Sequence, residues 1–100
     1  MLMPILDSKI DTRSEQFQQN RSDMMKMLGL LDDLLEEASE GGGTEAITRL
    51  RSRDKMPIRE RISHALDRDS PFLEISPLAA WRSPFAIGSG FVVGVGVIEN

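Results

Sequence analysis

Apolar residues recur at helical spacing through the first half of this chain, and this stripe limits its fold more than any other feature. The steps between its members are seven, four, three, four and three residues, a rhythm that keeps side chains on one face of an α-helix. We therefore expect one long amphipathic helix over residues 13–40. The stripe consists of Phe17, Met24, Leu28, Leu31, Leu35 and Ala38, and the opposite face carries Asp32, Asp33, Glu36, Glu37 and Glu40.

Both ends of this helix carry recognisable signals. Thr12 followed by Glu15 forms a capping-box pattern, in which each side chain reaches the other's backbone N–H. The triplet at 41–43 is all glycine. Glycine adopts left-handed backbone angles readily and loses much conformational entropy in a helix, so the triplet predicts the end of the helix.

Two shorter helices are expected next. Thr44 is a candidate N-cap for the first of them, which carries Ala46, Ile47 and Leu50. Pro57 suits the first turn of the second, where its missing N–H is no loss. The apolar stripe of that second helix is Ile58, Ile62, Ala65 and Leu66.

The last third of the sequence changes to β character. Residues 72–75 form a short extended segment, residues 78–81 suit one helical turn, and residues 85–98 contain the strand formers of a longer strand. Glycine at 88, 90, 94 and 96 interrupts that strand, which often marks a bulge or the close approach of another backbone. The fold class predicted is α+β. Because 72–75 is the only other strand candidate, we expect a sheet that is truncated before it is complete.

Composition excludes several kinds of site. The chain has no cysteine and one histidine, His64, so neither a disulfide nor a zinc site of His and Cys is expected. His64 has no neighbouring nucleophile, which favours a packing role over that of a general base. The acidic helix face cannot surround a calcium ion, so no metal site is predicted. Without a secretory signal or a membrane span, a cytoplasmic location is expected.

Positive charge is concentrated in one segment of an otherwise acidic chain, whose net charge is −4. Three interpretations of this cluster stay open. It binds phosphate groups of a cofactor, it binds nucleic acid, or it is a solvated helix face or pairs with acids on a neighbouring subunit. No aromatic residue is interleaved with it and the net charge is negative, which argues against nucleic acid. The bases are Arg49, Arg51, Arg53, Lys55, Arg59 and Arg61, against Asp54 and Glu60.

Several motifs in order resemble a known family. They are Gly41-Gly42-Gly43-Thr44-Glu45-Ala46, then the run from Arg53 to Ile62 (RDKMPIRERI), then Ser70-Pro71-Phe72-Leu73-Glu74-Ile75, then the glycine-rich run from Gly88 to Gly96. This order resembles the N-terminal region of carboxyltransferase β subunits of biotin-dependent acyl-CoA carboxylases, of the propionyl-, methylcrotonyl- and geranyl-CoA type. The family has glycine where Asp54 and Asp69 stand. We expect left-handed backbone at both, a conformation that aspartate tolerates better than most residues.

The resemblance implies a fold and a role. It implies a flexible segment 1–12, a helical region 13–69, and the start of a crotonase-like domain at 70–100. The parent enzyme would transfer a carboxyl group from carboxybiotin to an acyl-CoA, and this fragment alone would be inactive, with no catalytic residue. Implied partners are a biotin carboxylase or biotin carrier subunit, which holds the biotin, and further copies of the β subunit in a hexamer. The best candidates for the phosphates of coenzyme A are Arg53, Lys55 and Arg59.

A function of a different class is also open. The long helix combines an apolar stripe with a dense acidic face, a combination that suits a non-enzymatic helical module docking in a partner's groove. The glycines at 88, 90 and 94 superficially match a dinucleotide-binding loop. They lie before and inside a strand and no helix follows, so they lack the context that such a loop requires.

Overall fold

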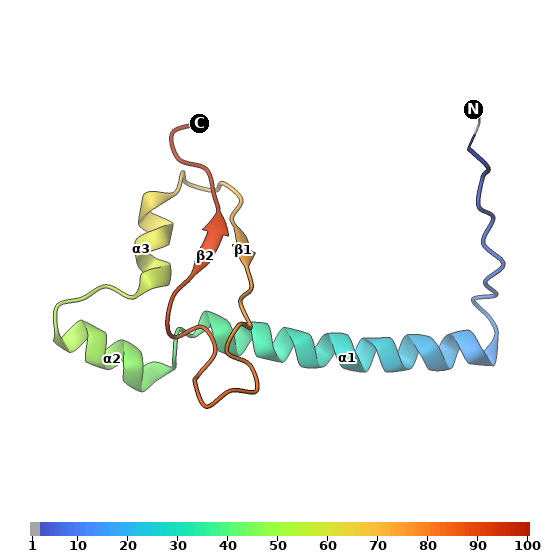
Figure 1. Ribbon diagram of the computed structural model, residues 1–100, viewed down its shortest axis with the longest axis horizontal. Coiled ribbons are helices and arrows are strands. Elements are labelled where there is room, and N and C mark those ends of the chain that lie inside the picture. Colours follow the sequence, from blue (N-terminus) through green and yellow to red (C-terminus); the bar gives the residue numbers. More distant parts are fainter. Residues whose placement is uncertain (1–2) are drawn as a thin grey trace. The chain divides into compact units, whose positions relative to one another are not determined.

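A computed structural model describes residues 3–100. Residues 1–2, the start of the segment that we expected to be flexible, lie outside the described residues. The elements are three helices and two short antiparallel strands, so the predicted combination of a long helix, two short helices and a small sheet is confirmed (Figure 1). They are α1 (Glu15–Ser39), α2 (Thr44–Ser52), α3 (Ile58–Ala65), β1 (Leu73–Ile75) and β2 (Val93–Val95). No helix within residues 3–100 is long and apolar enough to cross a bilayer.

The chain divides into two compact units, Met1–Leu31 and Asp32–Asn100, which are described in turn. In the first, α1 begins two residues later than predicted, and its N-cap is Ser14 rather than Thr12. The Ser14 hydroxyl accepts the backbone N–H of Phe17 at 3.1 Å. The Asp11 carboxylate accepts the N–H of Arg13 at 2.9 Å, which forms a turn that keeps Thr12 outside the helix. The capping-box prediction was wrong. A capping box needs its glutamate at the third position of the helix, whereas Glu15 is the first helical residue.

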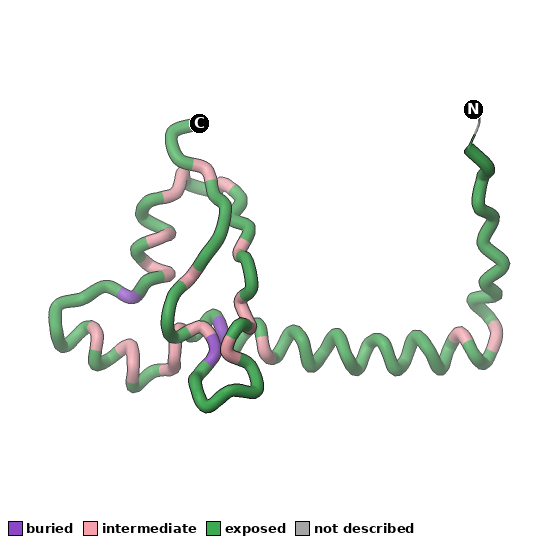
Figure 2. Tube along the Cα trace, viewed as in Figure 1, coloured by how far each residue is buried: buried purple, intermediate pink, exposed green. Residues whose placement is uncertain are grey.

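The apolar stripe of α1 is largely uncovered in the first unit. Met24, Met27, Leu28 and Leu31 each expose at least 40% of their surface. Figure 2 shows the same exposure along most of the helix. The periodicity therefore predicted the helix correctly, while within the described residues this part of the chain does not provide the surface that the stripe would cover.

The second unit is centred on the end of α1. Ala38 is 1% exposed and Ile87 is 5% exposed, and they are the only buried hydrophobic side chains other than proline within residues 3–100. Gly88, with φ +71°, lies so close that a Cβ there would collide with the backbone carbonyl of Ala38. As predicted, the glycine triplet ends α1, with φ values of +64°, +94° and +90° at Gly41, Gly42 and Gly43.

Neither short helix begins as the sequence predicted. Gly43 occupies the N-cap position of α2, while Thr44 is already helical and makes no capping hydrogen bond. Pro57 occupies the N-cap position of α3, with φ −56° and an extended ψ of 147°, instead of its first turn. Extended backbone is natural at an N-cap, and Pro57 still contributes its carbonyl, which accepts the N–H of Arg61 at 3.1 Å.

The sheet pairs the two segments that the sequence indicated. Its register joins Leu73 to Val95 and Ile75 to Val93, with Glu74 opposite Gly94. The strand expected over 85–98 is reduced to Val93–Val95, because left-handed Gly88 and turns bend the chain before it. The segment 78–81 forms only isolated turns and no helix.

Close approach at the strand glycines is confirmed. A Cβ on Gly94 would overlap the Phe72 ring and lie 2.7 Å from the carbonyl oxygen of Leu73, and one on Gly96 would overlap Leu66. Phe72, Glu74 and Gly94 therefore share the covered face of the two-stranded ribbon. The opposite face is apolar and exposed, and it consists of Leu73 (67%), Ile75 (47%), Val93 (47%) and Val95 (62%).

Three aspartates shape the turns around α3. Asp54 and Asp69 are left-handed as predicted, with φ of 56° and 58°. The Asp67 carboxylate accepts the backbone N–H groups of Asn100 at 3.0 Å and Glu99 at 2.7 Å, which lowers the pKa of Asp67. These bonds attach the end of α3 to the segment that follows β2.

Candidate functional site

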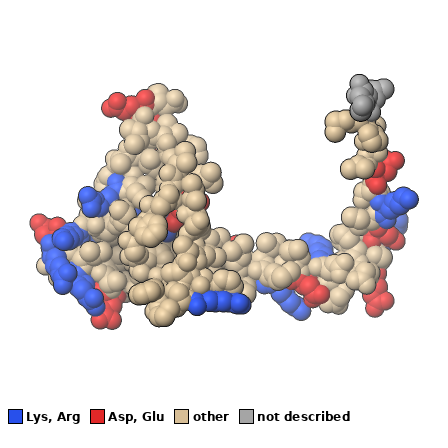
Figure 3. Space-filling view, in the orientation of Figure 1, with Lys and Arg blue, Asp and Glu red and all other residues tan. Residues whose placement is uncertain are grey.

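The basic cluster lies on α2, on α3 and on the turn that connects them, and Figure 3 shows Lys and Arg gathered over this part of the molecule. Two of its members are engaged in exposed ion pairs. Arg49 lies 3.5 Å from Glu45 one helical turn away, and Arg51 lies 2.8 Å from Glu60 across the α2–α3 junction. Exposed pairs of this kind stabilise a protein by less than about 1 kcal/mol. Part of the cluster is thus explained by pairing within the chain.

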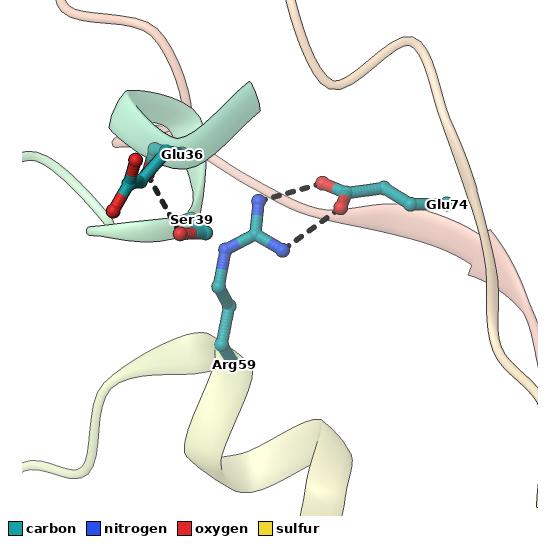
Figure 4. Close-up of polar contacts among 4 residues, drawn as sticks. All are labelled: Glu36, Ser39, Arg59 and Glu74. Atoms are coloured by element: carbon teal, nitrogen blue, oxygen red, sulfur yellow. Dashed lines mark hydrogen bonds and ion pairs between the residues drawn. The ribbon is translucent and has the colours of Figure 1, made fainter. Parts of the chain in front are cut away.

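Arg59 makes the strongest polar contact of the second unit. Its two terminal nitrogens donate to both carboxylate oxygens of Glu74 on β1, at 2.8 and 2.6 Å (Figure 4). The two side chains are only 25% and 23% exposed, so solvent screens this pair less than the others. The hydrogen bond from Arg59 lowers the pKa of Glu74, and Glu74 in turn raises the pKa of Arg59. The pair connects α3 to the sheet.

One atom of Arg59 remains without a partner. Its Nε is buried and makes no hydrogen bond within the described residues. Figure 4 shows the guanidinium lying between Glu74 and the last turn of α1, where the Ser39 hydroxyl donates to the carbonyl of Glu36 at 2.6 Å. A buried N–H without an acceptor costs about 1–3 kcal/mol, so this position favours an incoming acceptor.

A hollow of about 540 Å³ lies beside this pair in the second unit. Apolar residues line it together with three cationic residues, Lys55, Arg59 and Arg61, here called its basic rim, and with the acidic residues Glu40 and Asp54. The full lining is Ser39, Glu40, Gly41, Ile47, Leu50, Asp54, Lys55, Met56, Pro57, Ile58, Arg59, Arg61, Ser89 and Gly90.

The structure brings together two of the three residues that the resemblance implied for binding phosphate. Lys55 and Arg59 line the hollow, whereas Arg53 does not. Arg61 also lines it and was not singled out. Its place in the basic run was visible, but only the course of α3 after Pro57 shows that it lies on the same rim. Lys55 and Arg61 take part in no ion pair within residues 3–100, so both can hold an anionic group.

His64 is exposed in the last turn of α3 and does not line the hollow. The Ser39 and Ser89 hydroxyls at the hollow donate to backbone carbonyls of their own turns, at 2.6 and 2.9 Å. Within residues 3–100 no group of three or more acidic or histidine side chains is placed to hold a metal ion. This arrangement suits binding of an anionic or amphipathic ligand.

Known proteins resemble the chain over nearly all of its length, although no family model matches it. A probable biotin-dependent acyl-coenzyme A carboxylase beta2 subunit of Mycobacterium tuberculosis is 37% identical over 94 residues, which cover 94% of this chain and 18% of the relative. The mitochondrial methylcrotonoyl-CoA carboxylase beta chain of Arabidopsis thaliana is 40% identical over 99 residues, which cover 96% and 17% of the two chains.

A solved structure agrees with the sequence comparison. The β subunit of P. aeruginosa geranyl-CoA carboxylase superposes with a TM-score of 0.72 and 30% identity, over 95% of this chain and 18% of that subunit. This chain thus spans less than a fifth of the length of the relatives that it matches. Over that span, it is homologous to part of the β subunits of biotin-dependent acyl-CoA carboxylases.

Proposed function

We propose that this chain is the N-terminal part of a carboxyltransferase subunit that transfers a carboxyl group from carboxybiotin to an acyl-CoA. The observation that carries the proposal is the match over 94–96% of the chain to carboxylase β subunits, in sequence and in fold. The biotin is carried by a partner subunit, and further β subunits complete the oligomer. Residues 70–100 begin a crotonase-like domain, residues 13–69 form its helical entry, and residues 1–12 precede both.

The contribution of this part is packing and ligand anchoring. The Ser39 and Ser89 hydroxyls at the hollow donate to backbone carbonyls of their own turns, which supports a role in anchoring. One face of the ribbon is apolar and exposed, as expected for a surface that a larger domain covers. It consists of Leu73, Ile75, Val93 and Val95. Within such a subunit the fragment holds and positions, and the reacting atoms meet elsewhere.

A chimera tests the proposal. The segment of the M. tuberculosis relative that matches this chain is replaced by residues 1–100, and carboxylation of acyl-CoA by the reconstituted complex is measured. Retention of at least about a tenth of the parent rate supports the proposal, and a chimera that folds and assembles without any activity contradicts it. The parent lacking that segment is the control. The proposed location is the cytoplasm, and cell fractionation of the intact protein decides it.

The basic rim of the hollow gives a finer prediction. We expect Lys55→Ala in the active chimera to raise the KM for acyl-CoA about tenfold while kcat changes less than twofold, because a phosphate contact binds substrate and transition state equally. Arg53→Ala, which removes a cation outside the hollow, serves as the matched control. Unchanged kinetics in Lys55→Ala would assign Lys55 a structural role.

Arg59 was the third candidate, and its geometry suggests another role in the same site. Glu74 already occupies both of its terminal nitrogens, so Arg59→Ala would leave a carboxylate unpaired as well as removing a cation. We expect this variant to lose stability in addition to any change in KM, and thermal unfolding measured beside the kinetics separates the two effects.

A further inference from the structure

The guanidinium group of Arg59 has a second edge that its ion pair leaves free. A guanidinium carries five N–H donors, and both its terminal edge and the edge that includes Nε can hold an oxyanion through two hydrogen bonds. Glu74 occupies the terminal edge, at 2.8 and 2.6 Å. The other edge includes Nε, which is buried and has no partner within residues 3–100. That edge can therefore still hold one oxyanion.

The free edge borders the hollow described above. Arg59 lines the hollow, and so does Ser39 in the last turn of α1, which Figure 4 shows beside the guanidinium. Ser39 is exposed, and the glycine triplet 41–43 follows it after one residue. Glycine gives the backbone unusual freedom, so a small movement of this turn admits a ligand oxygen to Nε.

Charges around the hollow make directed hydrogen bonds more important than net charge. Lys55 and Arg61 line it without an ion pair within residues 3–100, but Glu40 and Asp54 line it as well. The charge of Arg59 is balanced by Glu74. The field at the hollow is therefore weak, and an anion gains most from the free edge of Arg59. A phosphate group, with several acceptor oxygens, fits an edge that donates twice.

We propose that Glu74 is a positioning residue for a phosphate-binding site at this hollow, because it holds the guanidinium of Arg59 with the Nε edge toward the ligand. Glu74 does not line the hollow itself. It lies on β1 opposite Gly94, so a paired strand fixes its backbone. An arginine that is held in advance loses less conformational entropy when the ligand binds. The inference rests on the proposed function, in which acyl-CoA supplies the phosphate.

Binding of coenzyme A to the 100-residue chain tests the role of Glu74, because two explanations predict opposite signs. A carboxylate that acts only as a nearby negative charge repels an anion, so Glu74→Gln would tighten binding. A positioning residue predicts the reverse. We expect Glu74→Gln to raise the Kd about tenfold, since one charge-assisted contact is weakened. Isothermal titration calorimetry measures it at a temperature at which both chains are folded.

Glu60→Gln is the matched control for this experiment. Glu60 also pairs with an arginine, Arg51 at 2.8 Å, but neither residue lines the hollow. Its substitution should change the Kd less than about twofold, as for a surface pair remote from the ligand. Unchanged or tighter binding by Glu74→Gln, or equal weakening by both substitutions, would overturn the proposal.

The Nε–H group of Arg59 gives a direct readout. An NMR spectrum that correlates side-chain N–H protons with their nitrogens identifies its signal by the loss of that signal in Arg59→Lys. We expect coenzyme A to shift the signal, and pantetheine, which has no phosphate, to leave it in place. A signal that ignores coenzyme A, or that responds equally to pantetheine, would overturn the proposal even if Glu74→Gln fails to fold. An inactive chimera with intact coenzyme A binding would contradict the proposed function alone, so the two fail separately.

Discussion

At the scale of single residues, glycine determines where this fold can close. Gly42 lies against Ser89, and a Cβ there would be 2.9 Å from that side chain. Gly94 and Gly96 leave room for Phe72 and Leu66, so these two larger side chains pack directly against the backbone at the glycines. Small apolar interiors depend on such fits, because little other surface is buried to compensate for a misfit.

Gly94→Ala tests this fit. The added methyl would overlap the Phe72 ring and crowd the Leu73 carbonyl, so we expect the free energy of unfolding to fall by about 2 kcal/mol, as for other overpacked positions. Gly90→Ala is the control, because no atom lies within 4 Å of its Cβ position. Urea unfolding of the 100-residue chain measures both, and equal stabilities would show that the strand moves aside at little cost.

At the scale of elements, α3 is attached to its surroundings at both ends. Near its start, Arg59 forms the two-bond pair with Glu74 of β1. After its end, the backbone N–H of Asp67 donates to the carbonyl of Val97 at 2.8 Å while its carboxylate holds the two following amides. These two attachments fix the helix over one face of the ribbon and leave the other face free.

The pair with Glu74 makes stability depend on pH in a known direction. The pKa of Glu74 is lowered from 4.5 in the folded chain, so the pair contributes fully above that value and its contribution is lost as the pH falls through the folded pKa. We expect Glu74→Gln to lower the free energy of unfolding by about 2 kcal/mol at pH 7. Below pH 4.5 the difference in unfolding free energy between the parent chain and the variant should become smaller. Thermal unfolding at pH 7 and pH 3.5 measures it, and a difference independent of pH would contradict the assignment.

At the scale of the whole molecule, the sequence contains more apolar surface than its own fold covers. The ribbon presents four aliphatic side chains to solvent on one face, and Phe85 and Phe91 are 76% and 73% exposed. Exposed apolar patches of this extent usually mark contacts with further protein. This agrees with relatives whose chains are more than five times longer than the matched segment.

Leu73→Ser distinguishes the isolated chain from the larger subunit. In the 100-residue chain we expect its stability to change by less than about 0.5 kcal/mol, because the side chain is 67% exposed. In the chimera the same change would lie in a covered face and cost about 2–3 kcal/mol. Thermal unfolding of both proteins is the measurement, and an equally small effect in the chimera would show that this face stays uncovered there.

Local patterns predicted the elements better than their details. The stripe and the glycine triplet located α1 to within two residues at its start and one at its end, and strand formers located the paired segments. Caps were harder to predict, because Thr12, Ser14 and Asp11 are all competent and only the turn decides among them. The pairing of Arg59 with Glu74 spans 15 residues, and no local sequence pattern indicates it. Lys55 and Arg61 lie on different segments, and only the folded structure shows that they line the same hollow.

The contact between Gly88 and Ala38 also has an evolutionary consequence. Each of the three nearest atoms that a side chain at position 88 would meet belongs to the backbone of Ala38, not to its methyl group. Trimming residue 38 to glycine would therefore create no room. A harmful replacement of Gly88 should have no compensating suppressor at position 38, and the two positions should show no covariation among descendants of this sequence.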